Sequence, residues 1–330
     1  MEKNVNILTG VRPTGSLTIA NYLGAVKPLL ELQNAGEEPL LFVADLHAIT
    51  DYEPSQVKGF IKELVADYLA LGVDPAKTTI YIQSDIIGPL MTLTAYLARL
   101  TTVAELLRIP TIKDKIKHGQ SPESANALLF FYPVLMAADI LIQKSKSIPV
   151  GEDQVAHLET TRMLADRFNK KYGEVFPIPK VHQVKSLRIL SLKGDGKMSK
   201  SSPDGAIFLT DTPEAAEKKI KSAQTAMDKE ITPNLESLIL IAKLLDSTED
   251  EQKKVDDIIE RHKAGEQVMG EFKGLVSEIV KRFLVKFQTK RAEVLKTPDY
   301  IVELLKKGAD IASQNAEATM KQVEEKMFGV

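Results

Sequence analysis

The stretch from residue 7 to residue 24 constrains the fold most, because it joins a buried strand to a helix through a glycine-containing turn. Apolar residues between 5 and 8 predict the strand, glycine and proline between 10 and 15 break it, and helical spacing of apolar residues follows. A helix N-terminus with free backbone N–H groups binds phosphate well. However, Ser16-Leu17 stands where a Walker lysine would be and there is no G-x-G-x-x-G, so a purely structural turn is the alternative interpretation.

A second stretch, Gly196-Lys-Met-Ser-Lys-Ser-Ser202, carries two lysines among glycine and small hydroxyl residues. Lysine is a flexible point charge, so Lys197 and Lys200 predict a mobile clamp for a polyanion such as a triphosphate. Taken alone, most such runs of lysine and serine are solvated basic loops. Taken with the first stretch, this second one resembles the signature of class I aminoacyl-tRNA synthetases. Thr18-Ile19-Ala20-Asn21 is similar to that family's first motif, and Lys197-Met198-Ser199-Lys200-Ser201 matches its second motif, KMSKS.

Strands and helices alternate after the first turn. Continuous apolar runs at 39–45 and 78–84 predict buried strands of a parallel sheet, and helical spacing at 54–71 predicts the helix between them. We therefore expect an α/β fold with a Rossmann-like doubly wound parallel sheet. From about residue 212 onward the pattern is helical, which predicts a C-terminal all-helical domain.

The chain of 330 residues is long enough for a main domain and a smaller one. We expect residues 1–210 to form the Rossmann-like catalytic domain, including a connecting insertion at about 105–180 and the lysine loop at 197–201. The C-terminal helix 309–330 is expected to complete this domain. Residues 211–308 form the helical domain, for which the resemblance implies anticodon binding.

Further elements are predicted between these landmarks. Residues 89–108 predict one apolar helix with few charges, which either lies in the core or forms a subunit interface. Helices are also expected at 128–142 and 155–169, and a short strand at 206–210. Five basic residues surround the apolar stripe of the helix near 275–291 and are expected to serve tRNA, not folding: Lys281, Arg282, Lys286, Lys290 and Arg291.

Composition excludes several classes of protein. The chain has no cysteine, which excludes disulfides, a thiolate nucleophile and a zinc ribbon, and its five histidines nowhere form H-E-x-x-H, so no protein metal site is expected. A net charge of −2 argues against indiscriminate nucleic-acid binding, so no DNA partner is expected. No long apolar span or signal peptide is evident. We expect a cytoplasmic protein without membrane contact.

Asp139 is the single carboxylate in the almost wholly apolar segment 128–142. A buried charge costs several kcal/mol unless it meets a donor or a cation. Either another protein group pairs with Asp139 or the carboxylate accepts an N–H from a ligand. Met136 lies on the same helical face. His47 follows the strand at 39–45, at the edge where open α/β sheets bind ligands, although a simple loop histidine is the alternative.

The likeness to the family becomes more specific in four stretches and covers essentially the whole chain. These stretches resemble bacterial-type tryptophanyl-tRNA synthetases: residues 45–50, 132–141, 149–154 and 161–169. The related tyrosyl-tRNA synthetases share the two nucleotide motifs but not this combination. The resemblance implies activation of L-tryptophan by ATP, with Mg²⁺ bound through the triphosphate. It also implies transfer of the aminoacyl group to the 3′ end of tRNA(Trp) by a homodimer.

The resemblance also implies three sets of site residues. The catalytic set is Lys197, Lys200, Ser201 and Lys115. The ATP-binding set is Arg12, Pro13, Thr14, Ala20, Asn21, Gly151, Glu152, Asp153, Ile189, Lys197, Met198, Ser199, Lys200 and Ser201. The tryptophan-binding set is Asp139, His47, Met136, Tyr132, Gln154, Leu8 and Gly10, with Asp139 accepting the indole N–H.

Two residues depart from the family pattern. Ala20 stands where the first motif normally has glycine, and Arg12 stands where many relatives have glutamine. Arg12 brings a permanent charge and a planar donor fork, which suits a phosphate. Two rival functions remain open: a tyrosyl-tRNA synthetase, and a non-catalytic RNA-binding paralogue, against which the intact lysine loop argues.

Overall fold

The computed structural model describes residues 5–110, 112–113, 126–149, 151, 155–182, 187–194, 196–225 and 228–329. Strands β1 (Leu8–Val11), β2 (Leu40–Val43) and β3 (Thr79–Ile82) pair in parallel in that order, and β4 (Ser147–Pro149) pairs with β5 (Lys180–His182). A single parallel pairing between Ile7 and Ser147 joins β1 to β4. Across the sheet the order is therefore β3-β2-β1-β4-β5. This is the order of a doubly wound sheet, and it confirms the predicted fold class.

Helices connect the parallel strands. Between β1 and β2 the chain forms α1 (Ile19–Asn21), the π-helical η1 (Tyr22–Val26) and α2 (Lys27–Asn34), and between β2 and β3 it forms α3 (Asp45–Ala48) and α4 (Pro54–Leu71). Gly72 ends α4, because its φ of 108° lies in the left-handed region that glycine adopts without steric cost. All four residues of β2 are buried, as expected for a strand covered on both faces.

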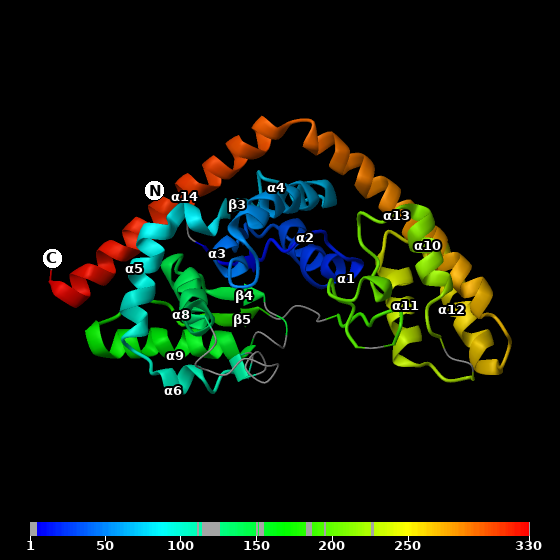
Figure 1. Cartoon of the computed structure of the whole chain (residues 1–330), viewed down its shortest axis with the longest axis horizontal. Helices are drawn as coiled ribbons and strands as arrows, with labels where there is room; N and C mark the ends of the chain where they lie inside the picture. The colour runs from blue at the N-terminus through cyan, green and yellow to red at the C-terminus, as the bar shows by residue number, and fades with distance from the viewer. Residues whose placement is uncertain are drawn as a thin grey trace.

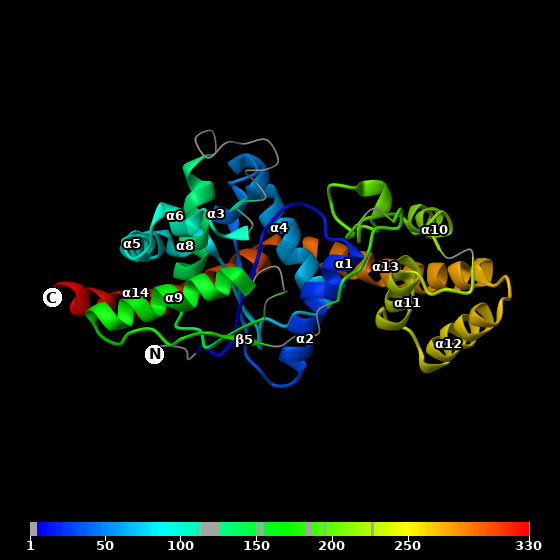
Figure 2. The ribbon, with the colours of Figure 1, turned by 90° about the horizontal axis from the view of Figure 1, so that it is seen from below.

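Two hydrophobic cores lie on the two faces of the sheet. Leu41 and Val43 of β2 join the first core with α10 (Pro213–Lys221), α11 (Pro233–Leu244), α12 (Glu249–Ala264) and α13 (Met269–Leu295). Leu40 and Phe42 join the second core with α5 (Ile87–Ala98), α6 (Val103–Leu106), α8 (Ala127–Ile142), α9 (Val155–Tyr172) and α14 (Pro298–Phe328). The structure also contains the 3₁₀ turns η2 (Gln83–Ile86) and η4 (Pro203–Gly205). Helices α10–α13 gather at one end of the molecule and α5, α6, α8 and α9 at the other (Figures 1 and 2).

The prediction of a single helix over 89–108 is wrong, because α5 ends at Ala98 and α6 begins at Val103. Thr102 and Glu105 form a capping box, in which each side chain accepts from the other residue's backbone N–H. Arg167 of α9 then pairs with Glu105 at 2.6 Å. These polar groups start a new helix at a place where the apolar spacing alone continues.

The prediction of a short strand at 206–210 is also wrong. In this segment only Phe208 makes an isolated antiparallel bridge, to Thr18. The Asp211 side chain accepts the backbone N–H of Phe208 at 2.9 Å, which turns the chain instead of extending it. Thr212 then caps α10, as its position before Pro213 predicts.

Four of the five basic residues on α13 take part in ion pairs. Their partners lie on other elements or in loops: Lys281 pairs with Glu217, Arg282 with Glu251, Lys286 with Asp246, and Arg291 with both Glu63 and Asp67. These residues thus have contacts within the chain, and the expectation that they serve tRNA stays a prediction. Lys290 is exposed and is paired with no carboxylate in the part of the chain that the structure describes.

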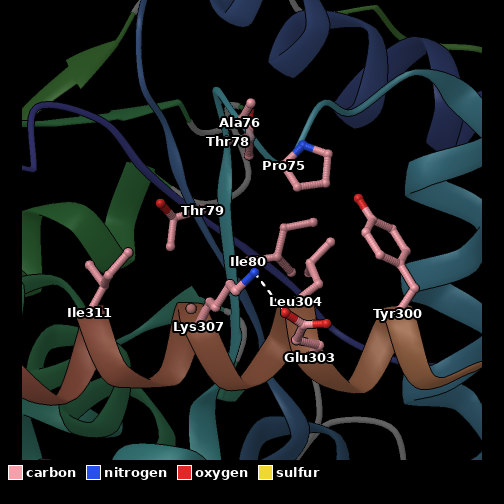
Figure 3. Close-up of a pocket in the computed structure, with 11 residues that line it drawn as sticks. Pro75, Ala76, Thr78, Thr79, Ile80, Tyr300, Glu303, Leu304, Lys307 and Ile311 are labelled. Carbon is pink, nitrogen blue, oxygen red and sulfur yellow. Dashed lines mark ion pairs between the residues drawn. The ribbon is translucent and has the colours of Figure 1, made fainter.

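Helix α14 packs along β3, the edge strand of the sheet. Gly308 permits this, since a Cβ there would overlap the carbonyl oxygen of Ile80. A surface groove of about 310 Å³ opens between α14 and residues 75–80, with Tyr300, Leu304 and Ile311 on its helical wall (Figure 3). None of the described residues assigned to the three predicted site sets lines this groove.

The close approach at Gly308 gives a stability prediction with a matched control. We expect Gly308→Ala to lower the free energy of unfolding by about 1–3 kcal/mol, the usual cost of forcing a methyl group into a packed contact. Gly274 of α13 has nothing within 4 Å of an added Cβ. Gly274→Ala should therefore raise stability by up to about 1 kcal/mol through helix propensity. Thermal melts of the two variants check this, and a Gly308→Ala midpoint at or above that of the unmodified protein would contradict the packing.

Among the described helices, none combines the length and the apolar character that crossing a bilayer requires.

Candidate functional site

The carboxyl ends of β1 and β4 define a natural ligand edge. In a doubly wound sheet, ligands bind where neighbouring strands connect in opposite directions, outside the carboxyl ends of the strands. Here β1 leads directly into the turn that contains Arg12, Pro13 and Thr14, and β4 ends two residues before Gly151. The sheet therefore brings these four predicted ATP residues to one edge. Four other predicted site residues lie outside the described part of the chain: Lys115, Glu152, Asp153 and Gln154.

The first motif begins a capped helix. Thr18 Oγ1 accepts the backbone N–H of Asn21 at 3.2 Å, while the Asn21 side chain accepts the backbone N–H of Thr18 at 3.0 Å. The segment after the lysine loop docks beside this cap, because Ile19 donates to the carbonyl of Ile207 and Leu209 donates to that of Leu17. Ala20 is partly buried against the first core. The fold thus holds both signature motifs together.

The lysine loop closes back on the first motif. Met198 donates its backbone N–H to the carbonyl of Ile189, and both side chains are buried in the first core, where they anchor the loop. Lys197 is exposed. The Lys200 ammonium donates to Thr14 Oγ1 at 3.1 Å and to the carbonyl of Gly15 at 2.7 Å. An ammonium has three N–H donors, so one remains for a further acceptor such as a phosphate oxygen.

The pKa of Lys200 lies closer to neutral pH than that of an ordinary lysine. Burial lowers its pKa to about 8, and the negative charge of Asp67 opposes this effect. Ser199 and Ser201 lie beside it in the loop, with their hydroxyl oxygens 3.0 Å apart. A desolvated cation flanked by small hydroxyls is suited to a charge that develops on an incoming phosphate.

Arg12 stands at the rim of the same turn. Its guanidinium pairs with the Asp51 carboxylate at 2.5 Å, and both side chains are 39% exposed. An ion pair with this degree of exposure contributes about 0–1 kcal/mol to stability. Arg12 can therefore exchange the carboxylate for a phosphate at little cost.

A second polar cluster surrounds Asp139, which is completely buried on α8. The Gln83 side-chain amide donates to both carboxylate oxygens, at 2.9 and 2.8 Å, and His47 Nε2 lies 3.0 Å from one of them. The backbone N–H of Leu46 donates to Gln83 Oε1, which fixes the amide orientation. The structure thus satisfies Asp139 within the chain, by the pairing that was one of the two alternatives from the sequence.

The net electrostatic effect on this cluster is a raised pKa of the Asp139 carboxyl, with burial as the largest cause. Burial raises the pKa of the Asp139 carboxyl, while the hydrogen bond and charge of His47 and the hydrogen bond from Gln83 lower it. A carboxylate has about four acceptor positions. The three contacts from Gln83 and His47 leave room for one further donor.

Gln83 is a site residue that the sequence analysis missed. It is fully buried, and it is the first residue after β3. Asp45 follows β2 in a similar place and accepts the backbone N–H of Ser84. The signal that would have found Gln83 is the one used for His47, namely a polar residue at the carboxyl edge of a parallel strand.

Aromatic groups extend the Asp139 cluster. Tyr132, Met136 and Asp139 follow one another at i, i+4 and i+7 along a single face of α8. The Tyr132 hydroxyl lies 2.9 Å from Nε2 of His157, a second contact that the sequence analysis missed, and its ring meets His47 edge-on. Four of the seven predicted tryptophan-site residues thus lie together in this cluster: Asp139, His47, Met136 and Tyr132.

The two remaining described members of that set belong to β1. Leu8 is buried in the second core. Gly10 packs against the Phe42 ring, which would overlap any Cβ at this position. Glycine is therefore required there for packing.

Among the residues that the structure describes, no group of three histidine or acidic side chains could hold a metal ion.

The fold and these two clusters define a nucleotide-binding α/β protein of the class I synthetase type. The family described as "tRNA synthetases class I (W and Y)" matches residues 1–285. The tryptophan–tRNA ligase of Bacillus subtilis is 38% identical over 337 residues, which cover 97% of this chain and 97% of that protein. The chain belongs to the class I tRNA synthetase family that comprises the tryptophan and tyrosine enzymes, which confirms the resemblance found in the sequence.

Solved structures agree with this assignment. Tryptophanyl-tRNA synthetase from Campylobacter jejuni, complexed with ADP and tryptophan, matches with a TM-score of 0.84 and 32% identity over 99% of this chain and 100% of that chain. The enzyme from Mycoplasma pneumoniae matches with a TM-score of 0.86 and 31% identity over 99% of this chain and 98% of that one. The similarity therefore extends across the sheet and the helical region alike.

Proposed function

We propose that this protein is a tryptophan–tRNA ligase, which activates L-tryptophan with ATP and transfers it to the 3′ end of tRNA(Trp). The observation that carries the choice of amino acid is the buried carboxylate of Asp139. It is held ready by Gln83 and His47, and it lies in an apolar core where an indole N–H can meet it.

In the first step the tryptophan carboxylate attacks the α-phosphate of ATP, forming tryptophanyl-adenylate and releasing pyrophosphate. A carboxylate is already ionised at neutral pH, so the chain needs no general base. Catalysis then comes from positioning and from neutralising phosphate charge. We assign this task to Lys200, Lys197 and Arg12; Lys200 contacts the turn after β1, in which Arg12 also lies. Mg²⁺ enters with ATP as part of the substrate, bound through the triphosphate.

In the second step a ribose hydroxyl at the end of the tRNA takes the tryptophanyl group and AMP leaves. We propose that residues 1–210 together with the C-terminal helix 309–330 carry out this chemistry. Residues 211–308, which include α10–α13, bind the anticodon region. Lys290 of α13 is exposed, so its charge is available for RNA phosphate. The protein works in the cytoplasm, where translation takes place.

Amino-acid-dependent pyrophosphate exchange tests the proposed function. We expect exchange with tryptophan, and far weaker exchange with tyrosine or phenylalanine. Exchange that is faster with tyrosine would identify a tyrosyl-tRNA synthetase. Absence of exchange with all three, in a protein that binds tRNA, would identify a non-catalytic RNA-binding paralogue.

We also propose that the protein is a homodimer. Apolar side chains stand exposed on three neighbouring helices, namely Ile87 and Met91 on α5, Val103 on α6 and Phe131 on α8. A second copy of the chain would cover such a surface.

A charge placed in this surface should separate the copies. We expect Met91→Asp to convert a dimer to a monomer at micromolar concentration, measured by light scattering, because a buried unpaired carboxylate costs several kcal/mol. Val285 on α13 is also exposed, at 52%, but lies outside these helices. Val285→Asp should leave the mass unchanged. An unmodified protein that scatters as a monomer would refute the dimer.

A further inference from the structure

His157 is a buried polar residue to which the mechanism above gives no task. It lies on α9 and is 1% exposed. Its Nε2 atom lies 2.9 Å from the hydroxyl oxygen of Tyr132 on α8, the helix that packs beside α9 (Figures 1 and 2). Burying an imidazole is costly unless its ring makes a hydrogen bond, so the contact with Tyr132 offsets part of that cost.

The ring of Tyr132 meets two imidazoles edge-on. Its centroid lies 5.1 Å from that of His157, with 64° between the ring planes, and 6.2 Å from that of His47, with 83° between them. His47 in turn contacts Asp139 through Nε2. Edge-to-face contacts between rings favour a defined orientation. A continuous line of contacts therefore runs from His157, through Tyr132 and His47, to the carboxylate that we assign to the indole N–H.

The direction of the hydrogen bond between Tyr132 and His157 decides what the phenol offers to a ligand. A hydroxyl has one hydrogen to donate and two lone pairs with which to accept. Burial favours the neutral imidazole, in which one nitrogen is an acceptor. With Nε2 as that acceptor, the O–H of Tyr132 points at His157. The phenol oxygen then acts toward a ligand as an acceptor alone.

The ligand donor that this oxygen would meet follows from the other polar groups. L-tryptophan carries two donor groups, the indole N–H and the α-ammonium. Among the described side chains of the predicted tryptophan-binding set, three have polar ends, and two of them, Asp139 and His47, contact each other at the place assigned to the indole. The third, Tyr132, lies two turns earlier on the same face of α8, about 10.5 Å along the helix axis. The ammonium therefore falls to Tyr132.

We propose that His157 is a positioning residue for the amino-acid site, which accepts the hydroxyl proton of Tyr132 and so fixes the phenol oxygen as an acceptor for the α-ammonium. The inference rests on the proposed function, because it takes tryptophan to be the substrate. Without His157 the O–H can rotate toward the ammonium, where two donors face each other and the hydrogen bond is lost. The preference of the site for ligands that carry an ammonium then depends on a residue of α9.

The test uses two competitive inhibitors of tryptophan-dependent pyrophosphate exchange, each of which lacks one group of the substrate. Tryptamine keeps the ammonium and lacks the carboxylate, whereas indole-3-propionate keeps the carboxylate and lacks the ammonium. His157→Phe keeps a flat ring and removes the acceptor. We expect this variant to raise KM for tryptophan and the inhibition constant of tryptamine roughly tenfold, the effect of losing a hydrogen bond to a charged group. The inhibition constant of indole-3-propionate and KM for ATP should not change.

Two further variants show whether the acceptor itself matters. His157→Gln places an amide oxygen near the position of Nε2 and should restore most of the tryptamine affinity. His262→Phe on α12 is the matched control, since His262 is also a buried histidine with Nε2 near one oxygen, the carbonyl of Glu230. It should leave both inhibition constants in place. If His157→Phe weakens the two inhibitors equally, or changes neither, the inference is overturned, because His157 then only fills the core.

A double variant tests whether His157 acts through the phenol. In a Tyr132→Phe background, His157→Phe should cause no further loss of tryptamine affinity, because the hydroxyl is already absent. A further loss confined to tryptamine would contradict the proposed route. If His157→Phe does not fold, His157→Asn gives the same readout, since its shorter side chain withdraws the acceptor from the hydroxyl. If the unmodified protein shows no exchange with tryptophan, the proposed function fails, which is a distinct result.

Discussion

Asp139→Ala should lower kcat/KM for tryptophan activation by about 30- to 150-fold, which corresponds to a loss of roughly 2–3 kcal/mol of transition-state binding. The physical reason is that an indole N–H would lose a charged acceptor in a fully buried site. Phenylalanine has no ring donor, so its much slower activation should change little. The ratio of the two kcat/KM values in pyrophosphate exchange therefore falls, and this ratio is the measurement.

The chain makes the binding step easy to follow. It contains no tryptophan, so the fluorescence of bound L-tryptophan can be excited without a background from tryptophan residues of the protein. The control is Asp85→Asn on η2, since the Asp85 carboxylate accepts from the backbone N–H of Ile82 and is not part of the Asp139 cluster. A folded Asp139→Ala variant that keeps the original selectivity would show that this carboxylate only supports the core.

Lys200→Ala should reduce the rate of adenylate formation by about 100- to 1,000-fold, the range seen when one preorganised electrostatic donor is removed. KM for tryptophan should stay nearly constant, because the ammonium contacts the turn at Thr14 and Gly15, away from Asp139. Lys193→Ala removes another exposed lysine preceding the loop and should have little effect. Loss of tryptophan affinity with an unchanged rate would disprove the assigned role.

Lys200 also predicts a pH dependence. Burial holds its pKa at about 8, so the neutral amine gains population as the pH rises above that value. Since the charged form serves the triphosphate, kcat/KM for ATP should decline above about pH 8. Lys200→Arg keeps a permanent charge and should remove the decline, even if its overall rate is lower. A flat profile for the unmodified protein would contradict this assignment.

Much of this fold can be predicted from local patterns. The runs that became β2 and β3, the helix α4 with its terminal Gly72 and the apolar helix α8 all have periodicity or punctuation that a single sequence displays. The π-helical turn at Tyr22–Val26 shows no such signal. The break between α5 and α6 does have one, the Thr102-x-x-Glu105 capping-box spacing, but the continuous apolar pattern across it favoured a single helix.

Some residues of the candidate site can likewise be predicted from the sequence, and others cannot. Residue type and position pointed to Asp139, His47 and Lys200, because a lone buried acid and a lysine loop are conspicuous along the chain. Gln83 was missed because an amide carries no charge, and its importance appears only when β2, β3 and α8 meet. The ion pairs of α13 were missed because their carboxylates come from distant segments. Amphipathic spacing shows that a basic residue is exposed, but not what faces it.

The placement of α14 against β3 has a consequence for how the protein is made. The strands β1 to β3 leave the ribosome early, yet the open edge of β3 is covered by a helix that is synthesised nearly the whole chain later. Until then the nascent protein presents a bare strand edge, the kind of surface that recruits other chains into aggregates. The dependence on α14 thus ties completion of the sheet to the synthesis of a helix that lies far downstream in the chain.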